Sequence, residues 1–192
     1  MKEDIFIFFD TEFTSLNKDA DLISVGIVTK DNKHFYAELN DFDASKCNSF
    51  VKSDVLPQLR FYNKIPNKVF LKTDPFDYNV LGDKKLVKRS LLDWLSKLPK
   101  GEKIFVGDVV MWDWVLLNDL LADYTDGTPQ LPKDIHYIPT DIATILRSKD
   151  MDPDVDRQQF CGKQLSKLHN ALEDAKLAMW CWDKLYPEKS KS

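Results

Sequence analysis

Carboxylates at the end of the first predicted strand could hold a divalent cation. Asp10 and Glu12 follow directly on the apolar run Ile5 to Phe9. Side chains two residues apart in a strand point to the same side, so these two carboxylates can converge on one cation. The alternative is a solvated strand end, and the chain's 25 Asp against 6 Glu make Asp-based patterns common by chance. The apolar run favours the cation site, because central strands of such sheets end at the crevice where ligands bind.

A second candidate position is Asp113, an acid at the start of a predicted helix that includes Trp114 and Leu117. It ends an otherwise apolar stripe, and a buried carboxylate without a cationic partner is costly. We therefore expect either exposure to solvent or a bound cation at this position. The alternative is an ordinary first-turn acid favoured by the helix dipole. Asp108, outside the helix, is a competitor that ranks second for the same role.

His169 and Asp174 form a third candidate at the start of the last predicted helix. Asn170, followed three residues later by Glu173, indicates a capping box, with His169 just outside the helix and Asp174 in its first turn. A histidine that faces a carboxylate at a helix start suits proton abstraction near a metal. The alternative is an ordinary surface histidine.

One other pair has the same spacing, His136 with Asp141, but Pro139 between them argues against a helix start. The candidate residues therefore occur in a fixed order along the chain. Two acids end the first strand, one acid begins a central helix, and a His/Asp pair begins the last helix. Four carboxylates that converge without a basic partner repel one another unless divalent cations bind them. Oxygen-rich sites favour Mg²⁺ or Mn²⁺ over zinc, so the sequence predicts a centre for one of these ions.

The elements that must position these residues follow from hydrophobic periodicity and turn residues. The predicted strands span 5–10, 22–29, 33–39, 103–106 and 135–138, and the predicted helices span 83–98, 113–121 and 170–185. A hairpin turn at 30–33 joins the second and third strands. Three strands in a row followed by helix–strand alternation predict an α/β fold with a mixed sheet covered on both faces.

The length of 192 residues fits one domain, predicted to span 1–188 with a long insertion at about 41–82 and a flexible tail at 189–192. The three cysteines include no C-x-x-C pair, which favours buried thiols in a reduced, cytoplasmic protein. The apolar N-terminal run is too short for a membrane span. The net charge of −4 argues against a broad basic surface for nucleic acid.

Taken together, these motifs resemble the DEDDh branch of the DnaQ-like exonucleases, which have a ribonuclease H-like fold. The family's first motif, F-D-x-E-T-T-G-L, is matched by Phe9 to Leu16, and its second-motif acid by Asp113. Its third motif, H-x-A-x-x-D, is matched by His169, Ala171 and Asp174. The resemblance covers residues 4 to about 186.

An additional family acid, in D-x-x-x-x-A/L-R, resembles Asp141 to Arg147, although this match is weak. Phe13 replaces the usual Thr and Ser15 the usual Gly, which puts in doubt how this loop meets the substrate. The D-T-E-F form and the L-I-S-V-G-I-V strand are most similar to a small stand-alone exoribonuclease subfamily. The resemblance implies a five-stranded sheet with three antiparallel strands and then parallel ones.

The resemblance also implies a two-metal hydrolysis that releases nucleoside 5′-monophosphates from the 3′ end of single-stranded RNA or DNA, with RNA favoured. Asp10 would bridge both ions, and Glu12 and Asp174 would complete the ion on the nucleophile side. Asp113 would hold the second ion directly or through water. His169 would take the proton from the attacking water.

Substrate contacts are expected beside these acids. By analogy with the family, Leu16 would lie against the terminal base and Thr14 near the terminal sugar. Phe13 and Trp112 are further candidates for substrate binding, although a Trp beside an apolar stripe is more often core. The same branch often forms homodimers, which leaves the oligomeric state open.

Two groups of cations could meet phosphates, namely Arg60 to Lys68, where basic and aromatic residues alternate, and Lys84 to Arg89. Packing aromatics beside a solvated surface is the favoured interpretation of the first group, and plain helix surface that of the second. Two other functions remain open. One is a non-catalytic nucleic-acid or protein-binding module of the same fold, and the other is a ribonuclease H-like endonuclease.

Overall fold

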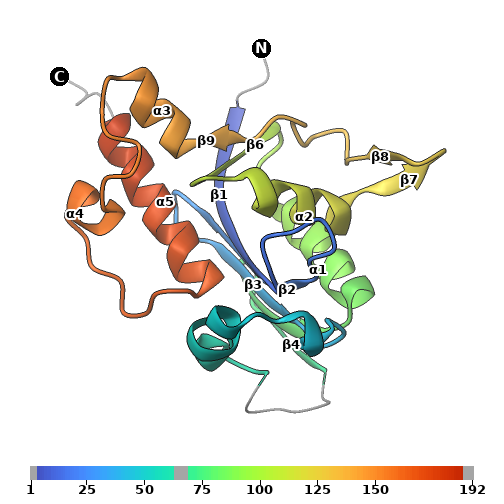
Figure 1. Cartoon of the computed structure of the whole chain (residues 1–192). Helices are drawn as coiled ribbons and strands as arrows, with labels where there is room; N and C mark the ends of the chain where they lie inside the picture. Colours follow the sequence, from blue (N-terminus) through green and yellow to red (C-terminus); the bar gives the residue numbers. More distant parts are fainter. Residues whose placement is uncertain (1–3, 63–68, 188–192) are drawn as a thin grey trace.

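The protein is described here by a computed structural model covering residues 4–62 and 69–187. Its centre is a seven-stranded mixed sheet with the order β4-β5-β3-β2-β1-β6-β9 (Figure 1). The strands of this sheet are β1 (Asp4–Phe13), β2 (Leu22–Thr29), β3 (His34–Leu39), β4 (Phe70–Thr73), β5 (Asp77–Gly82), β6 (Glu102–Gly107) and β9 (Thr140–Asp141).

The predicted opening of three antiparallel strands is confirmed. β2 pairs antiparallel with both β1 and β3, and all eight residues of β2 are buried. β6 then adds parallel to β1, and β9 adds parallel to β6. Apolar and β-branched side chains fill β2 on both faces, which is typical of a central strand covered by helices on each side.

The number of strands differs from the predicted five, because β4 and β5 extend the sheet beyond β3. β5 pairs parallel with β3, and β4 pairs antiparallel with β5. Both strands lie in the segment 41–82. The fifth strand predicted at 135–138 is wrong, since only Ile135 forms an isolated bridge, to Lys103, while Tyr137 and Ile138 are exposed. The strand that pairs with β6 begins just after Pro139, at Thr140.

Helices cover the two faces of the sheet (Figure 1). The longer helices are α1 (Lys84–Lys97), α2 (Met111–Leu121) and α5 (Ala171–Leu185), as predicted to within two residues, and the shorter ones are α3 (Ile142–Ser148) and α4 (Arg157–Cys161). α1 and α2 contribute to the core on one face, around Phe9 and Trp94. α5 packs with α3 and α4 on the other face, around Phe8 and Trp182.

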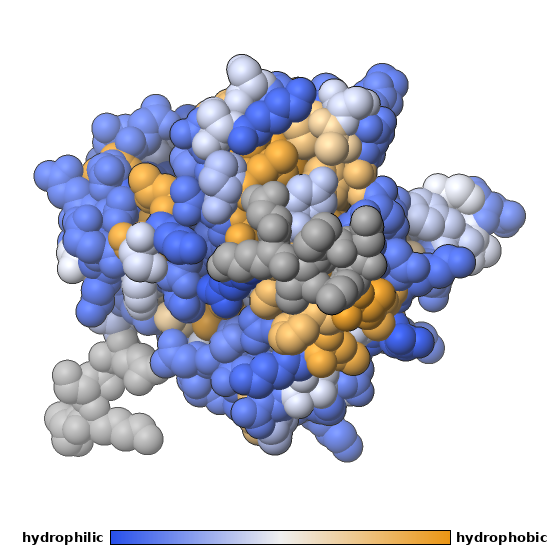
Figure 2. Space-filling model, turned by 90° about the horizontal axis from the view of Figure 1, so that it is seen from below, coloured by the Kyte–Doolittle hydropathy of each residue, from blue (hydrophilic) through white to orange (hydrophobic). Residues whose placement is uncertain are grey.

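A third, smaller core lies under the segment 41–62, where Val51 and Val55 pack against Ile23. This segment forms the helical turns η1 (Ala44–Lys46), η2 (Val51–Val55) and η3 (Leu56–Gln58). The view from below in Figure 2 shows apolar patches near the centre of that face, with hydrophilic surface around them. A short hairpin, β7 (Asp123–Thr125) and β8 (Thr128–Gln130), follows α2 and projects to the right in the view of Figure 1.

Two further expectations concern cysteines and membranes. All three cysteines are free, and Cys47 and Cys181 are buried as predicted, whereas Cys161 is partly exposed. None of the helices within residues 4–62 and 69–187 is both long and apolar enough to cross a bilayer. The predicted tail at 189–192 lies outside the described residues.

Candidate active site

β1 carries the first two candidate acids at its carboxyl end. Asp10 lies opposite Gly26 of β2 in the antiparallel register, and Glu12 lies opposite Ser24. A register shift between Glu12 and Phe13 ends the regular pairing. Since β6 runs parallel to β1 on its other side, the loop after β6 emerges at the same edge of the sheet. The topology therefore brings the acid of the following helix α2 toward the acids of β1.

Three of the predicted carboxylates come together. One ligand oxygen from each of Asp10, Glu12 and Asp174 can be chosen so that all lie within 4.8 Å of one another. Asp174 is in the first turn of α5, far along the chain from β1. An acid of the last helix therefore lies beside the acids of the first strand, as the sequence predicted.

Gly26 allows α5 to reach this position. A Cβ atom on Gly26 would lie 2.2 Å from the backbone nitrogen of Leu172 and 2.3 Å from the carbonyl carbon of Ala171. No side chain can be accommodated at such distances, so the first turn of α5 rests directly on the backbone of β2. This contact occurs where Asp10 faces Gly26 across the ladder. The contact sets the distance between Asp174 and Asp10.

Asp113 is held by hydrogen bonds from β1. Its Oδ1 accepts from the backbone nitrogen of Thr11 at 3.0 Å and from the Thr11 hydroxyl at 2.6 Å. Thr11 is buried between the two acids of β1. Asp113 is not part of the three-carboxylate cluster, but it lines the same cavity.

Asp108, the competitor of Asp113, has a cationic partner. The Arg157 guanidinium donates from Nε to Asp108 Oδ2 at 2.8 Å and from Nη2 to Oδ1 at 2.9 Å. This bidentate pair ties the loop after β6 to α4 and lines a separate cavity of about 170 Å³ that also borders Asp10 and Asp174. Because Arg157 already neutralises Asp108, Asp113 remains the better candidate for a metal ligand.

The additional acid Asp141 has a structural role in the same loop. Its Oδ1 accepts from the backbone nitrogen of Val109 at 2.7 Å, and its Oδ2 accepts from that of Thr144 at 3.0 Å, as the N-cap of α3. Val109 has a φ of 53°, a left-handed conformation that a β-branched residue rarely adopts. Asp141 thus fixes the strained loop that leads into α2.

The start of α5 is built differently from the predicted capping box. Asn170 is the N-cap residue, but its side chain makes no capping bond. The side chain that accepts a hydrogen bond from the N-cap backbone is that of Asp174 and not that of Glu173. Asp174 Oδ2 accepts from the backbone nitrogen of Asn170 at 3.0 Å. Glu173 instead pairs with Lys176 and with Arg60. The helix boundary was predicted correctly, whereas the capping partners were wrong.

His169 immediately precedes this N-cap, with a left-handed φ of 56°. Its ring meets the ring of Phe50 edge-on, with centroids 5.0 Å apart and planes at 87°. His169 and Asp174 both line a cavity of about 330 Å³ together with the acids of β1. The histidine is therefore in the same cavity as the carboxylates, as its sequence position predicted.

The wall of this cavity includes some of the predicted substrate contacts. Phe13 and Leu16 line it, and Leu16 is 72% exposed. Thr14 is fully buried, where its hydroxyl oxygen accepts from the backbone nitrogen of Asp21 at 3.0 Å. Neither Thr14 nor Trp112 is among the described residues that line the cavity. The segment 41–62 supplies the remaining wall through Asn48, Phe50, Val51 and Val55.

The carboxylates resist ionisation when no cation is bound. Burial, and then the charge of Asp113, raises the pKa of Asp10 well above its usual value. Burial, and then the charge of Asp174, raises the pKa of Glu12 from 4.5 to about 8. Burial raises the pKa of Asp174 to about 6, against the opposing effect of the Asn170 backbone amide. Perturbed carboxyl groups gathered at a cavity indicate a functional site that a divalent cation would complete.

The predicted cationic segments are mostly engaged within the protein. Arg60 lies over the Tyr36 ring, 4.5 Å from its centroid, and pairs with Glu173. Phe61 packs against Phe70. The rest of that segment, at 63–68, lies outside the described residues.

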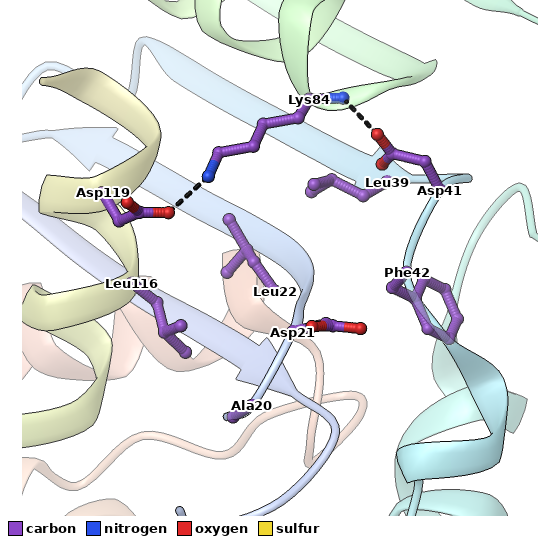
Figure 3. Close-up of a pocket in the computed structure, with 9 residues that line it drawn as sticks. All are labelled: Ala20, Asp21, Leu22, Leu39, Asp41, Phe42, Lys84, Leu116 and Asp119. Carbon is purple, nitrogen blue, oxygen red and sulfur yellow. Dashed lines mark hydrogen bonds and ion pairs between the residues drawn. The ribbon is translucent and has the colours of Figure 1, made fainter. Parts of the chain in front are cut away.

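Lys84 closes a pocket of about 200 Å³ that is separate from the carboxylates (Figure 3). Its side chain reaches Asp119 on α2, and its backbone nitrogen donates to Asp41 Oδ2 at 3.0 Å. Lys88 likewise pairs with Asp123. These two lysines tie α1 to its neighbours, in agreement with the interpretation as ordinary helix surface.

Two known proteins share a short stretch of sequence with this chain. No protein-family model matches it. Over 52 residues it is 40% identical to proteins from two strains of Mycobacterium tuberculosis, each named 3′–5′ exoribonuclease. The match covers 27% of this chain and 31% of the length of each relative.

Two solved structures are similar over nearly the whole chain. The Neurospora crassa Pan2 catalytic unit, with protease and nuclease domains, has a TM-score of 0.54 at 14% identity, over 94% of this chain and 26% of that one. The Saccharomyces cerevisiae Pan2 pseudoubiquitin hydrolase–RNA exonuclease module in complex with A7 RNA has a TM-score of 0.51 at 15% identity, over 95% and 28%. At such identities the likeness concerns the fold. The fold is ribonuclease H-like, as predicted.

Proposed function

We propose that this protein is a divalent-metal-dependent 3′–5′ exoribonuclease of the DEDDh type. The observation that carries the proposal is the cluster of Asp10, Glu12 and Asp174. One carboxylate oxygen from each of them lies within 4.8 Å of the other two, in a cavity that His169 also lines. The names of the two Mycobacterium tuberculosis relatives and the fold shared with the Pan2 structures support the same activity. The whole chain to residue 188 would then be one exonuclease domain, with 41–82 as an insertion that supplies part of the cavity wall.

The donor set fits Mg²⁺ or Mn²⁺. Among the described residues, only carboxylates make up the cluster, and hard oxygen ligands suit these ions. Asp10, Glu12 and Asp174 would hold the first ion, and Asp113 would contribute to a second one. Bound there, such ions would supply Lewis-acid chemistry, polarising the scissile phosphate and lowering the pKa of the attacking water. They would also relieve the repulsion that raises the carboxyl pKa values.

Within this proposal the other cavity residues bind and orient the 3′ end. His169 would accept the proton from the attacking water, which its place in the same cavity as Asp174 allows. Leu16, half-exposed Phe50 and Leu168 give the cavity an apolar rim suited to a nucleobase. Trp112 and Thr14 remain proposed substrate contacts on the strength of the family resemblance alone.

RNA is favoured over DNA as the substrate. The two Mycobacterium tuberculosis relatives are named exoribonucleases, and the Saccharomyces cerevisiae module was solved with an RNA. Single strands suit the site because the cavity of about 330 Å³ has room for little more than one nucleotide.

The test is a time course on single-stranded RNA and DNA of several lengths, labelled at the 3′ or the 5′ end, with Mg²⁺, Mn²⁺ or EDTA. We expect mononucleotides from the 3′ end of RNA, and no product with EDTA. Intact oligonucleotides with both ions would refute the exonuclease and leave the binding-module alternative. Internal cuts in a circular or 3′-blocked substrate would instead indicate an endonuclease.

A further inference from the structure

A buried acid that the proposed reaction does not use lies on β3. Glu38 is fully buried, and its carboxylate accepts from three consecutive backbone nitrogens, those of Arg60, Phe61 and Tyr62. The Phe61 nitrogen is 3.1 Å from either carboxylate oxygen, and the Tyr62 nitrogen is 2.7 Å from Oε2. A charge without solvent is tolerated only with such a set of donors. Glu38 therefore fixes the end of the segment 41–62 on the sheet.

The same carboxylate is connected to the start of α5 through Tyr36. The Tyr36 hydroxyl donates to Glu38 Oε1 at 2.7 Å and accepts from Asn170 Nδ2 at 3.3 Å. Asn170 Nδ2 also donates to the carbonyl oxygen of Gln58 at 3.3 Å. Tyr36, Glu38 and Asn170 are all essentially fully buried. Burial and the nearby Glu38 raise the Tyr36 pKa well above its usual value, so the hydroxyl keeps its proton and remains a donor.

The backbone on either side of Asn170 carries the proposed catalytic pair. The Asn170 backbone nitrogen donates to Asp174 Oδ2 at 3.0 Å, and His169 immediately before it has the left-handed φ of 56°. A left-handed conformation is uncommon outside glycine, although histidine adopts it more readily than most residues, and contacts around the turn stabilise it. Besides the close approach of α5 to Gly26, the side chain of Asn170 therefore ties this turn to Tyr36 on β3 and to Gln58 in η3.

We propose that Tyr36 and Glu38 are positioning residues for His169 and Asp174, acting through the buried hydrogen bonds that run from Glu38 through Tyr36 to Asn170. This inference rests on the proposed function, because it assigns the network a role in the geometry of that reaction. A network that only secured the segment 41–62 would leave kcat and the exchange of the Asn170 backbone amide unchanged when the Tyr36 hydroxyl is removed. The two roles can therefore be separated at the Tyr36 hydroxyl.

Tyr36→Phe is the informative variant, because it removes the bond to Asn170 and leaves the three backbone nitrogens on Glu38. Its matched control is Tyr78→Phe on β5, where an equally buried ring loses a hydroxyl that donates to Asp93 on the other face of the sheet. On single-stranded RNA with Mn²⁺, we expect Tyr36→Phe to lower kcat about 10-fold with KM changed less than about 2-fold. Tyr78→Phe should keep the wild-type kcat.

Hydrogen exchange at the Asn170 backbone amide provides a readout that does not depend on activity. We expect about 10-fold faster exchange in Tyr36→Phe and no change in Tyr78→Phe. Equal kcat values in the two variants, or wild-type exchange at Asn170 in Tyr36→Phe, would overturn the proposal. If the wild-type protein degrades no RNA, the proposed function fails, while the exchange measurement still decides whether Tyr36 holds this turn.

A second variant covers the case in which Tyr36→Phe folds poorly. Asn170→Ala removes the other end of the same bond and leaves the Tyr36 hydroxyl on Glu38. If the bond positions the site, Asn170→Ala alone should lower kcat about 10-fold with KM changed less than about 2-fold. Where it folds, the double variant Tyr36→Phe/Asn170→Ala should lose no more kcat than Asn170→Ala alone. Losses that multiply instead would show that the two residues act independently, contrary to the proposal.

Discussion

The two halves of the carboxylate site are held by different kinds of interaction. Asp10 and Glu12 lie in a central strand, where the backbone ladder to β2 fixes their direction. His169 and Asp174 lie at a helix start that depends on tertiary contacts, namely the close approach to Gly26 and the buried side chain of Asn170. The first half is specified by local sequence, and the second by residues far away in the chain.

This difference suggests where substitutions act. Changes at Asp10 or Glu12 should alter the chemistry of the carboxylates while leaving the backbone in place, because the ladder to β2 holds it. Changes that affect the start of α5 should displace Asp174 together with the first turn of the helix that carries it. The variants below test that contrast in order of decreasing expected effect.

Asp10→Asn should abolish activity while stabilising the metal-free protein. The neutral amide cannot replace a carboxylate shared by the proposed ions, so we expect hydrolysis of RNA to fall about 10⁴-fold. Without metal, the wild-type protein must either protonate the Asp10 carboxyl group or hold its charge near Asp113 and Glu12, and the neutral amide avoids this cost, so the unfolding temperature of the variant should rise. Initial rates and thermal unfolding in EDTA measure the two effects.

Asp183→Asn serves as the control for Asp10→Asn, since Asp183 is an exposed residue of α5 paired only with Lys30 in the described part of the chain. It should change neither activity nor the unfolding temperature appreciably. An Asp10→Asn protein that still degrades RNA would remove this residue from the site.

Gly26→Ala should displace α5 from the sheet. Because the added Cβ would meet backbone atoms at 2.2 Å, the helix must move, and we expect a loss of about 1–3 kcal/mol in the free energy of unfolding. Movement of Asp174 by a fraction of an ångström should lower kcat by about 10²-fold. Urea unfolding and RNA kinetics provide the measurements.

Gly127→Ala is the control that separates the effect of displacing α5 from the effect of lost stability. Gly127 has a φ of 75° with no atom within 4 Å of an added Cβ, so alanine there is strained but moves no neighbour. The variant should lose stability and keep its kcat. Equal losses of kcat in both variants would contradict the role assigned to Gly26.

The sequence predicted those parts of the fold that depend on local pattern. The alternating and apolar runs of β1, β2, β3 and β6 were recognised, and Asp83 caps α1 by accepting from the Leu86 nitrogen at 2.8 Å, at the predicted start. β5 was missed because it depends on pairing with β3, which is distant in sequence, and β4 and β9 were missed because they have only four and two residues. The five-residue helix α4 was missed for the same reason.

The candidate site was predicted residue by residue, but its supports were not. The order of the motifs predicted that Asp10 and Asp174 lie close together. Nothing in the sequence around Gly26, in contrast, indicates that a helix contacts this residue. The capping prediction failed because Asn170 and Glu173 have the right spacing, while tertiary partners compete for both side chains. The sequence ranked Asp113 above Asp108, and the ion pair that supports this ranking comes from Arg157, which is 49 residues from Asp108 in sequence and was not foreseen.

The stability of the metal-free protein should fall as pH rises. Folding raises the pKa of Glu12 from 4.5 to about 8, so between these values the folded protein binds more protons than the unfolded chain. The stabilising effect of the protonated Glu12 is complete below pH 4.5 and is lost as pH rises through about 8. Asp174, with a pKa of about 6, adds to the loss at lower pH.

Unfolding temperatures in EDTA between pH 5 and pH 8.5 measure this slope. Glu12→Gln should flatten it, because the amide does not titrate. With Mn²⁺ the added stabilisation should increase with pH, since the ion requires deprotonated ligands. A metal-free protein whose stability rises over this interval would show that these carboxyl groups are ionised in the folded state.

Thr11→Val should have the smallest effect and should act through Asp113. Valine has the shape of threonine but lacks the hydroxyl, and the backbone nitrogen of residue 11 would still donate to Asp113 Oδ1. Burial raises the pKa of Asp113 and the Thr11 hydroxyl opposes that rise, so its loss should raise the pKa further. We expect Mn²⁺ affinity near neutral pH to fall about fivefold, as one lost hydrogen bond of about 1 kcal/mol implies. Calorimetric titration with Mn²⁺ measures this, and Thr11→Ser should restore the affinity because it returns the donor. If Thr11→Val and Thr11→Ser bind equally, the hydroxyl does not orient Asp113, and the strand-borne half of the site would be held by its backbone alone.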